Sequence, residues 1–289
     1  MKYQNDIDKM NTNRNLFLMS LPIFVELLLQ LLVGNVDQMM VSRVSQPSVA
    51  AIVNANQIMN LVIIVLSMAS TAVTVILSQY LGAQDEKNAS RTCMVSIVLI
   101  SGVSLAATIL VFAGHTPLYR AIHVPEEVFD EASLYLLIVG AFILVQGLYL
   151  TFSAMIRAFA MVKEVMIISV IMNAMNIVGN AILINGWFGM PQLGAVGAAI
   201  STDISKLVGL ALMIGMFFKS RRVKIGMSYL RPFPVQILKN LCLLAIPTGV
   251  ESFSYNLSQM IILGIVNSFG TLVTVTKGYC TIFANIDYV

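Results

Sequence analysis

Residues 21–41, LPIFVELLLQLLVGNVDQMMV, place two carboxylic acids and a carboxamide in a run that is otherwise apolar. Each residue of an α-helix advances by about 100°, so Glu26, Gln30 and Asp37 share one narrow face of the helix that this run predicts. A charged side chain costs roughly 2.5–3.5 kcal/mol at the bilayer centre, and membrane acids therefore usually mark a pathway. A buried carboxyl can exchange a proton near neutral pH. We interpret Asp37 as a candidate cation-exchanging group, and Glu26 and Gln30 as candidate pathway residues.

Two further stripes of amide and hydroxyl side chains recur at helical spacing, one in the run 50–80 and one in the run 164–188. Such side chains either join helices through interhelical hydrogen bonds or line a route for polar solutes, and the residues alone leave both interpretations open. The candidate pathway or coupling residues in these stripes are Asn60, Thr71, Asn173, Asn176 and Asn180.

Three more charged residues lie in apolar runs. Asp203 and Lys206 are three residues apart on one helix face, and this spacing predicts a structural ion pair. Glu251 follows a proline by four residues, as Glu26 does. Because proline can free a backbone carbonyl and kink a helix, each glutamate has either a local structural role or a place in the pathway.

The chain has 289 residues, of which 58% are hydrophobic and only 11% are charged, and its mean hydropathy is +0.86. Soluble domains carry about 25% charged residues, so this composition is typical of a membrane protein. Lipid offers no partners to backbone groups, and the apolar runs are too long for barrel strands, so the sequence predicts an all-α integral membrane protein. The predicted spans are 16–42, 50–80, 91–114, 132–156, 164–188, 193–218 and 240–267, with an eighth beginning near 272.

Most of the 17 Lys and Arg residues lie in the N-terminal tail and in the connections after the second, fourth and sixth spans. This asymmetry predicts a multi-pass protein of the plasma membrane with a cytoplasmic N-terminus. We interpret the basic segment 219–239 as a topology anchor and linker, the alternative being a binding site for anionic lipid or nucleic acid. The 3 cysteines are widely separated and the 2 histidines form no cluster, so neither a disulfide framework nor a metal site is expected.

A shift of 225 positions aligns LPIFVE (21–26) with IPTGVE (246–251), which share the proline and the glutamate. Duplicated bundles of this kind are common in transporters. The repeat predicts a cytoplasmic tail (1–15), an N-terminal six-helix lobe (16–218), the linker (219–239) and the start of a second lobe (240–289). In this reading the chain is truncated after the seventh helix and part of an eighth.

A series of motifs along the chain resembles the multidrug and toxic compound extrusion (MATE) family of cation-coupled efflux transporters. A typical member has twelve helices in two lobes, of which this chain corresponds to roughly the first two-thirds. The motifs are LPIFVE (21–26) followed by Asp37, SQYLGAQDEKNASR (78–91), VPEEVFDEASLYL (124–136), IRAFAMVKE (156–164), NAMNIVGNAI (173–182), LGAVGAAISTDISK (193–206) and IPTGVE (246–251).

The resemblance implies roles for several of the candidate residues. Asp37 matches the cation-coupling carboxylate of the family's N-terminal lobe, and Asn176 matches the asparagine near it. Archaeal-type members often carry a second acid four residues later, where this chain has Asn180, so the chain has one proton acceptor fewer. Glu251 matches an acid in the seventh span that takes part in cation or substrate binding in some members.

The residues and the resemblance together predict a secondary active transporter of the lipid bilayer. It would export amphipathic, mostly cationic drugs or toxic compounds by alternating access, in exchange for protons or for sodium bound at Asp37, without any other cofactor. A lipid or lipid-linked oligosaccharide flippase is an alternative, but it would need an Arg- and Lys-rich cavity for phosphate, and only Lys206 lies within the six predicted lobe spans. A membrane enzyme would need a nucleophile–base or metal constellation, which the spans lack. A non-transporting fragment is the remaining alternative.

Overall fold

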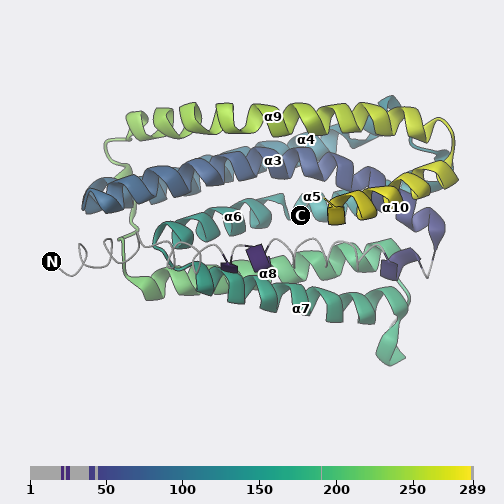
Figure 1. Ribbon diagram of the computed structural model, residues 1–289, viewed down its shortest axis with the longest axis horizontal. Coiled ribbons are helices and arrows are strands. Elements are labelled where there is room, and N and C mark those ends of the chain that lie inside the picture. The colour runs from purple at the N-terminus through teal and green to yellow at the C-terminus, as the bar shows by residue number, and fades with distance from the viewer. Residues whose placement is uncertain (1–20, 23, 27–38, 43–44, 190, 288–289) are drawn as a thin grey trace.

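The computed structural model describes residues 21–22, 24–26, 39–42, 45–189 and 191–287. All regular structure within these residues is helical, and the long helices lie side by side along one axis (Figure 1). The helices are α3 (Gln46–Gly82), α4 (Glu86–Ala121), α5 (Glu126–Ala141), α6 (Ile143–Ala158), α7 (Val162–Asn185), α8 (Gly194–Ser220), α9 (Val235–Asn267) and α10 (Thr271–Asp287), with short 3-10 turns η1 (Trp187–Gly189) and η2 (Met227–Leu230).

The predicted all-α membrane fold is confirmed, with one difference in the fourth span. That span is divided at Phe142 into α5 and α6, which meet at a bend of 46°. Helices α3, α4, α7 and α8 are each long and apolar enough to cross a bilayer, and α5 with α6 makes a fifth crossing if the bent pair is one span. Helix α9 contains Pro247, and its apolar first part ends at this proline.

Local side-chain chemistry sets several helix ends. Ser45 caps α3 by accepting a hydrogen bond from the Ser48 amide. Asp85 caps α4 by accepting from the backbone amide of Asn88 at 3.0 Å and from its side-chain amide at 2.7 Å. These two hydrogen bonds lower the pKa of Asp85 below its usual value, because they stabilise the ionised carboxylate. Gly186 ends α7 with a left-handed φ of 72°, which glycine adopts without steric cost.

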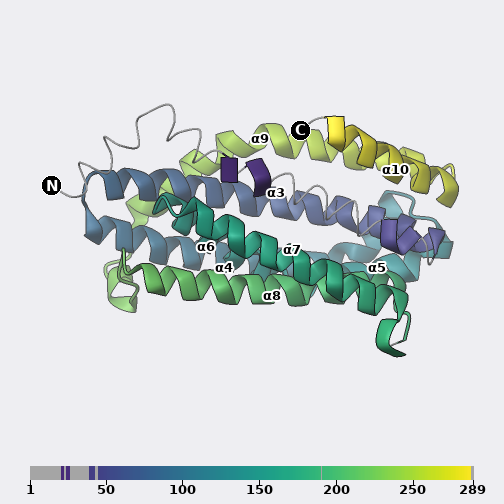
Figure 2. The same ribbon diagram turned by 60° about the horizontal axis from the view of Figure 1, so that its bottom comes forward.

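The helices form three layers, with α7 and α8 on one side of the molecule, α9 and α10 on the other, and α3 to α6 between them (Figures 1 and 2).

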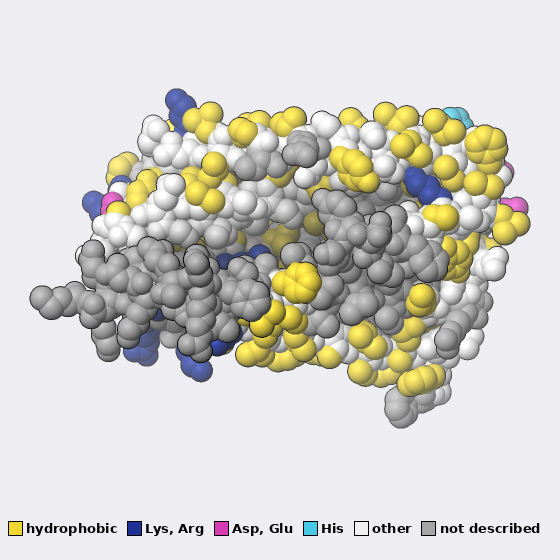
Figure 3. Space-filling view, in the orientation of Figure 1, with side chains coloured by type: hydrophobic (Ala, Val, Ile, Leu, Met, Phe, Trp, Pro, Cys, Tyr) yellow, Lys and Arg dark blue, Asp and Glu magenta, His cyan; other side chains and the backbone are white. Residues whose placement is uncertain are grey.

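Charge is distributed unevenly along the long axis of the molecule. Most of the Lys and Arg side chains visible in Figure 3 gather at the end nearest the N-terminus. They belong to the turns α3–α4, α6–α7 and α8–α9, whereas four acids open α5 at the opposite end: Glu126, Glu127, Asp130 and Glu131.

Helices α7 and α8 pack more closely than bulky side chains would permit. A β-carbon on Gly197 of α8 would lie 2.7 Å from the carbonyl oxygen of Leu183 on α7, and one on Gly179 of α7 would overlap the Ser201 hydroxyl of α8. Small residues at such seams let two membrane helices approach backbone to backbone, where packing and interhelical hydrogen bonds replace the hydrophobic effect that lipid removes. This seam therefore fixes the relative position of the polar residues on the two helices.

Helix α9 is held against α3 by a buried polar cluster at one end, by a hydrogen bond from the Gln57 side chain to the Asn256 carbonyl at 3.1 Å, and by apolar packing. The side-chain amide of Asn267, which is 3% exposed, donates to the Asn54 side-chain oxygen at 2.7 Å and to the Ile122 carbonyl at 2.8 Å, and its oxygen accepts from the Thr274 hydroxyl at 2.9 Å. We call Asn54, Asn267 and Thr274 the α9 clasp. Further along the same interface, Met68 of α3 fills the space that a side chain at Gly249 would need.

Gly197→Ala should destabilise the fold, because its methyl group would meet backbone atoms of α7 that cannot move without separating the helices. We expect a loss of about 1–3 kcal/mol, seen as a lower thermal unfolding temperature in detergent. Gly215→Ala on the same helix is the matched control, since nothing lies within 4 Å of its β-carbon position. It should be neutral or should stabilise by about 0.5–1 kcal/mol through helix propensity. Equal loss in both variants would contradict the close seam.

Asn267→Ala should loosen α9 from α3, because it removes the hydrogen bonds that the Asn54 side-chain oxygen and the Ile122 carbonyl accept from α9 in a place that water does not reach. The expected cost is about 1–2 kcal/mol, and limited proteolysis should cut the α9–α10 region sooner. Ser268→Ala is the control, since that exposed hydroxyl bonds only to the Ile265 carbonyl of its own helix turn. A protease pattern that is the same in both variants would rule out the clasp.

Candidate coupling and pathway site

The central candidate of the sequence analysis, Asp37, lies outside the described residues, as does Gln30. The side chain of Glu251 is also outside them, although its backbone belongs to α9. The roles of these three residues stay predictions. The structure does describe the residues that α3, α6, α7 and α8 contribute around the described parts of the first predicted span.

An amide and hydroxyl group lies at the seam of α7 and α8. Asn176 donates from its side-chain nitrogen to the Thr202 hydroxyl at 3.1 Å, and its side-chain oxygen accepts from the Asn180 amide at 3.3 Å. The Ser201 hydroxyl donates to the Asn176 backbone carbonyl at 3.0 Å. Asn176 and Asn180 are 5% and 0% exposed. The hydrogen bonds fix the orientation of both amides, as a site for a small cation requires.

Asn173, one turn before Asn176 on α7, is also buried, and its side-chain nitrogen has no hydrogen-bond partner among the described residues. The hydroxyl of Ser169, a further turn away, is also buried and lies close to the Tyr149 hydroxyl of α6. Buried polar groups in proteins are nearly always hydrogen-bonded, so unpaired ones indicate a bound water, an ion or a functional role. The polar stripe of α7 therefore combines a paired amide group with the unpaired amide nitrogen of Asn173.

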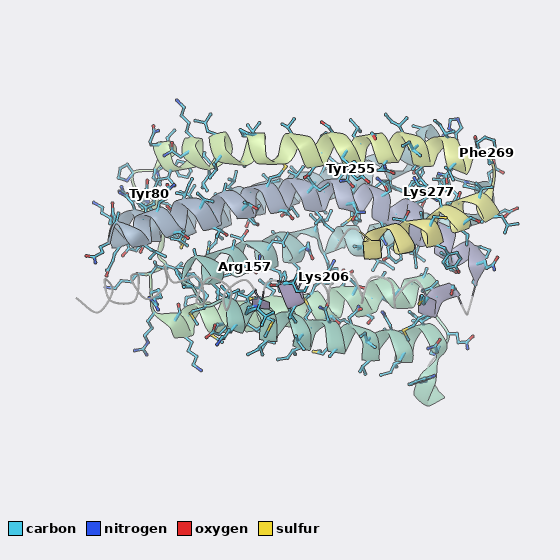
Figure 4. All side chains as sticks on the ribbon, viewed as in Figure 1. Tyr80, Arg157, Lys206, Tyr255, Phe269 and Lys277 are labelled. Carbon is cyan, nitrogen blue, oxygen red and sulfur yellow. The ribbon has the colours of Figure 1, made fainter. Side chains whose placement is uncertain are left out.

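Glu26 is joined to Arg157 in the last turn of α6. One guanidinium nitrogen of Arg157 donates to a carboxylate oxygen of Glu26 at 2.7 Å. Figure 4 labels Arg157 where it meets the described piece of chain that carries Glu26. The Glu26 side chain is 5% exposed, whereas that of Arg157 is 35% exposed. The pair ties the first predicted span to α6, and it neutralises an acid that lipid would otherwise reject.

The polar stripe of α3 does not converge with that of α7. Asn60 and Thr71 are exposed, and the Thr71 hydroxyl donates to the Ser67 carbonyl of its own helix. Helix α3 instead buries the opposite, mostly apolar side against α5, α6 and α9. The buried amide on α3 is Asn54, a member of the α9 clasp that the sequence analysis did not single out. Pathway roles for Asn60 and Thr71 stay predictions.

The predicted ion pair of Asp203 and Lys206 stays a prediction, although the charge of Lys206 does act on the Asp203 carboxyl. No hydrogen bond joins the two side chains, and neither carboxylate oxygen of Asp203 has a partner in the described part of the chain. Asp203 is 2% exposed, whereas Lys206, about 60° away around α8, is half-buried.

Two residues of this region were not predicted as site residues. Arg157 was counted among the charges that set membrane topology, and Thr202 was not singled out at all. Arg157 could have been found from Glu26, because an acid in a membrane span needs a positively charged partner and the sequence offered none in the same span. Thr202 gave no separate signal, because a threonine in an apolar helix most often bonds to its own helix backbone.

Removing Arg157 should harm stability more than removing Glu26. Arg157→Gln leaves an unpaired carboxylate that is almost fully buried, and breaking such a pair costs about 3 kcal/mol or more. Glu26→Gln leaves a guanidinium that already reaches the surface, and we expect a loss of about 1 kcal/mol. The double variant should recover much of the loss of Arg157→Gln. Thermal unfolding in detergent measures all three, and a larger loss for Glu26→Gln would contradict this account.

Comparison with known proteins agrees with this architecture. The MatE family model matches residues 22–182. The chain is 37% identical over 265 residues to the uncharacterized transporter YisQ of Bacillus subtilis (strain 168), covering 92% of this chain and 58% of YisQ. It is 26% identical over 250 residues to the probable multidrug resistance protein NorM of Thermotoga maritima, covering 84% of this chain and 52% of that protein. The chain thus spans about half the length of these relatives.

Among solved structures, the fold is similar to the inward-facing conformation of a multidrug resistance MATE family transporter of the MOP superfamily. The TM-score is 0.77 at 22% identity, and the match covers 85% of this chain and 55% of that one. This similarity concerns the fold alone. The family model, by contrast, covers more than half of the sequence, including the first predicted span and α7. The chain is therefore a member of the MATE family of multi-pass membrane transporters, which are not enzymes.

Proposed function

We propose that this chain belongs to a cation-coupled antiporter that exports amphipathic, mostly cationic drugs or toxic compounds by alternating access. Family membership supports transport coupled to a cation. The observation that carries the proposal within the molecule is the oriented amide group of Asn176 and Asn180, buried at the closest seam between two membrane-spanning helices. Buried amides are costly unless they are hydrogen-bonded, and here they are held in one orientation by each other and by Thr202, which offers a small cation a prepared polar group.

In this proposal Asp37 is the coupling carboxylate, and the oxygens of Asn176 and Asn180 assist it. A proton or a sodium ion on Asp37 and a cationic substrate would exclude one another, because both neutralise the same charge. One elementary charge that moves down a potential of 100 mV releases about 2.3 kcal/mol, which sustains a substrate gradient of roughly fifty-fold. Thr202 positions Asn176 through its hydroxyl.

The electrostatics of the described interior favour export of cations over transport of phosphate-bearing lipids. A lipid-linked oligosaccharide flippase would need basic side chains available to phosphate. Arg157, the basic residue of α6, is already neutralised by Glu26. The uneven charge along the axis supports a cytoplasmic N-terminus in the plasma membrane, since Lys and Arg are retained on the cytoplasmic side.

Asp37→Asn should abolish active efflux while leaving the amount of protein in the membrane unchanged. The measurement is ethidium efflux from cells or vesicles, and the expected rate is that of cells without the transporter. Asp85→Asn is the matched control, because Asp85 lies in a surface turn and asparagine also caps helices well, so efflux should be unaffected. Undiminished pumping by Asp37→Asn would remove Asp37 from its role.

The same assay identifies the coupling ion. A protonophore should stop efflux if protons drive it, and replacement of sodium by another cation should stop it if sodium does. Insensitivity to both treatments would contradict cation-coupled antiport.

A further inference from the structure

Asp203 is a membrane acid that the mechanism above does not use. It lies near the middle of the crossing formed by α8, it is 2% exposed, and neither of its carboxylate oxygens has a hydrogen-bond partner in the described part of the chain. Ala199 and Leu210, which lie within about 40° of Asp203 around α8, are buried as well. The carboxyl is therefore enclosed by protein and does not face lipid.

An ionised carboxylate with two unpaired oxygens is among the costliest groups that a membrane protein can bury, and it persists only if a positive partner neutralises it. A proton is the smallest such partner, because it removes the charge and leaves only a neutral polar group to accommodate. The spacing on α8 would allow a hydrogen bond from Lys206 to Asp203, but the structure shows none. Among the described residues, nothing else bonds to the carboxyl, so a proton is left as the partner that neutralises it.

The charged groups on every element that packs against α8 are few. Helix α3 contains no Asp, Glu, Lys or Arg, and those of α7 and α5 lie in the first two turns of each helix. On α6 the basic group is Arg157, which is bonded to Glu26. This leaves Lys206, one turn further along α8, as the positive charge that acts on Asp203 among the described residues. A nearby ammonium makes the ionised form attainable, so that the proton can leave as well as bind.

A second observation comes from α7, the closest neighbour of α8. The side-chain nitrogen of Asn173 is buried without a partner on its polar stripe, and the hydroxyls of Ser169 and of Tyr149 on α6 are buried close to each other. An unpaired buried donor next to buried hydroxyls indicates a site for internal water, which usually satisfies such groups. Water of this kind would give a proton on Asp203 a way to exchange.

We propose that Asp203 is a second, exchangeable proton site of this lobe, separate from Asp37. The protonated carboxyl is the resting form. On release the proton passes to water, and the carboxylate that remains is stabilised by the ammonium of Lys206. This inference goes beyond the proposed coupling role of Asp37 and does not require it.

The test is infrared difference spectroscopy of the purified protein between acidic and alkaline buffers. The wild-type protein should show a protonated-carboxyl band that disappears as the pH rises, and Asp203→Asn should lack this component while retaining the contributions of the other acids. Lys206→Met should keep the Asp203 component of the band, because the proton and not the ammonium neutralises the resting carboxyl. Asp85→Asn, at an exposed helix cap, should leave the band unchanged.

The proposal is overturned if the Asp203→Asn spectrum equals that of the wild type, or if the Asp203 component is the same at every pH. If Asp203→Asn does not fold, the wild-type protein can be treated with dicyclohexylcarbodiimide, which modifies protonated carboxyls in apolar surroundings. Peptide mass spectrometry should then find an adduct at Asp203 whose yield falls by about tenfold per pH unit above the midpoint. An adduct yield that does not change with pH would refute the proposal.

The outcome is separable from that of the efflux assay. Efflux that survives Asp37→Asn while the Asp203 band persists would reject the coupling role of Asp37 alone. Loss of efflux in Asp37→Asn without any Asp203 band would reject the second proton site alone.

Discussion

The requirement that lipid places on polar groups governs this molecule. A backbone or side-chain group that is buried in the bilayer has no water to bond with, so it needs a partner within the protein or it raises the energy of the fold. The chain meets this requirement with long helices for the backbone, with the α9 clasp, and with the Glu26–Arg157 pair. Among the described residues, the buried groups that remain without partners, above all Asp203 and Asn173, are for that reason the places where function is to be sought.

The α7–α8 seam converts this requirement into geometry. Glycine at positions 179 and 197 brings the two backbones close enough for Asn176 to reach Thr202 and for Ser201 to reach the Asn176 carbonyl. A wider seam would hold the same residues but would leave their amides to rotate. The close packing of small residues is therefore what orients the polar group. If a transporter moves α7 and α8 together as a rigid unit, the hydrogen bonds of this group are kept.

The sequence predicted the helices well and their contacts poorly. The apolar runs matched α3, α4, α7, α8 and α9 within several residues at each end, because length and hydropathy depend on the chain alone. The division at Phe142 was not predicted, because no proline marks it and Gly140, two residues earlier, is of a type that is common within membrane helices. The exposure of Asn60 and the burial of Asn54 could not be distinguished either, because both lie on the same apolar helix and only its neighbours decide which side is covered. The sequence shows Arg157 as a basic residue near the end of a span, but it does not show that Glu26 is its partner, because that depends on how spans far apart in the sequence pack together.

The α9 clasp has a consequence for how the layers can part. Its three hydrogen-bonded side chains lie where α9 ends and α10 begins, whereas contacts such as that of Met68 with Gly249 are apolar. In a bilayer, acyl chains replace apolar contacts at little cost, but they cannot replace hydrogen bonds. The described hydrogen bonds between α9 and α3, those of the α9 clasp and of Gln57 to the Asn256 carbonyl, thus lie in the second half of α9. The half that follows the α8–α9 connection is the part of the helix that can move away from α3 at the least cost.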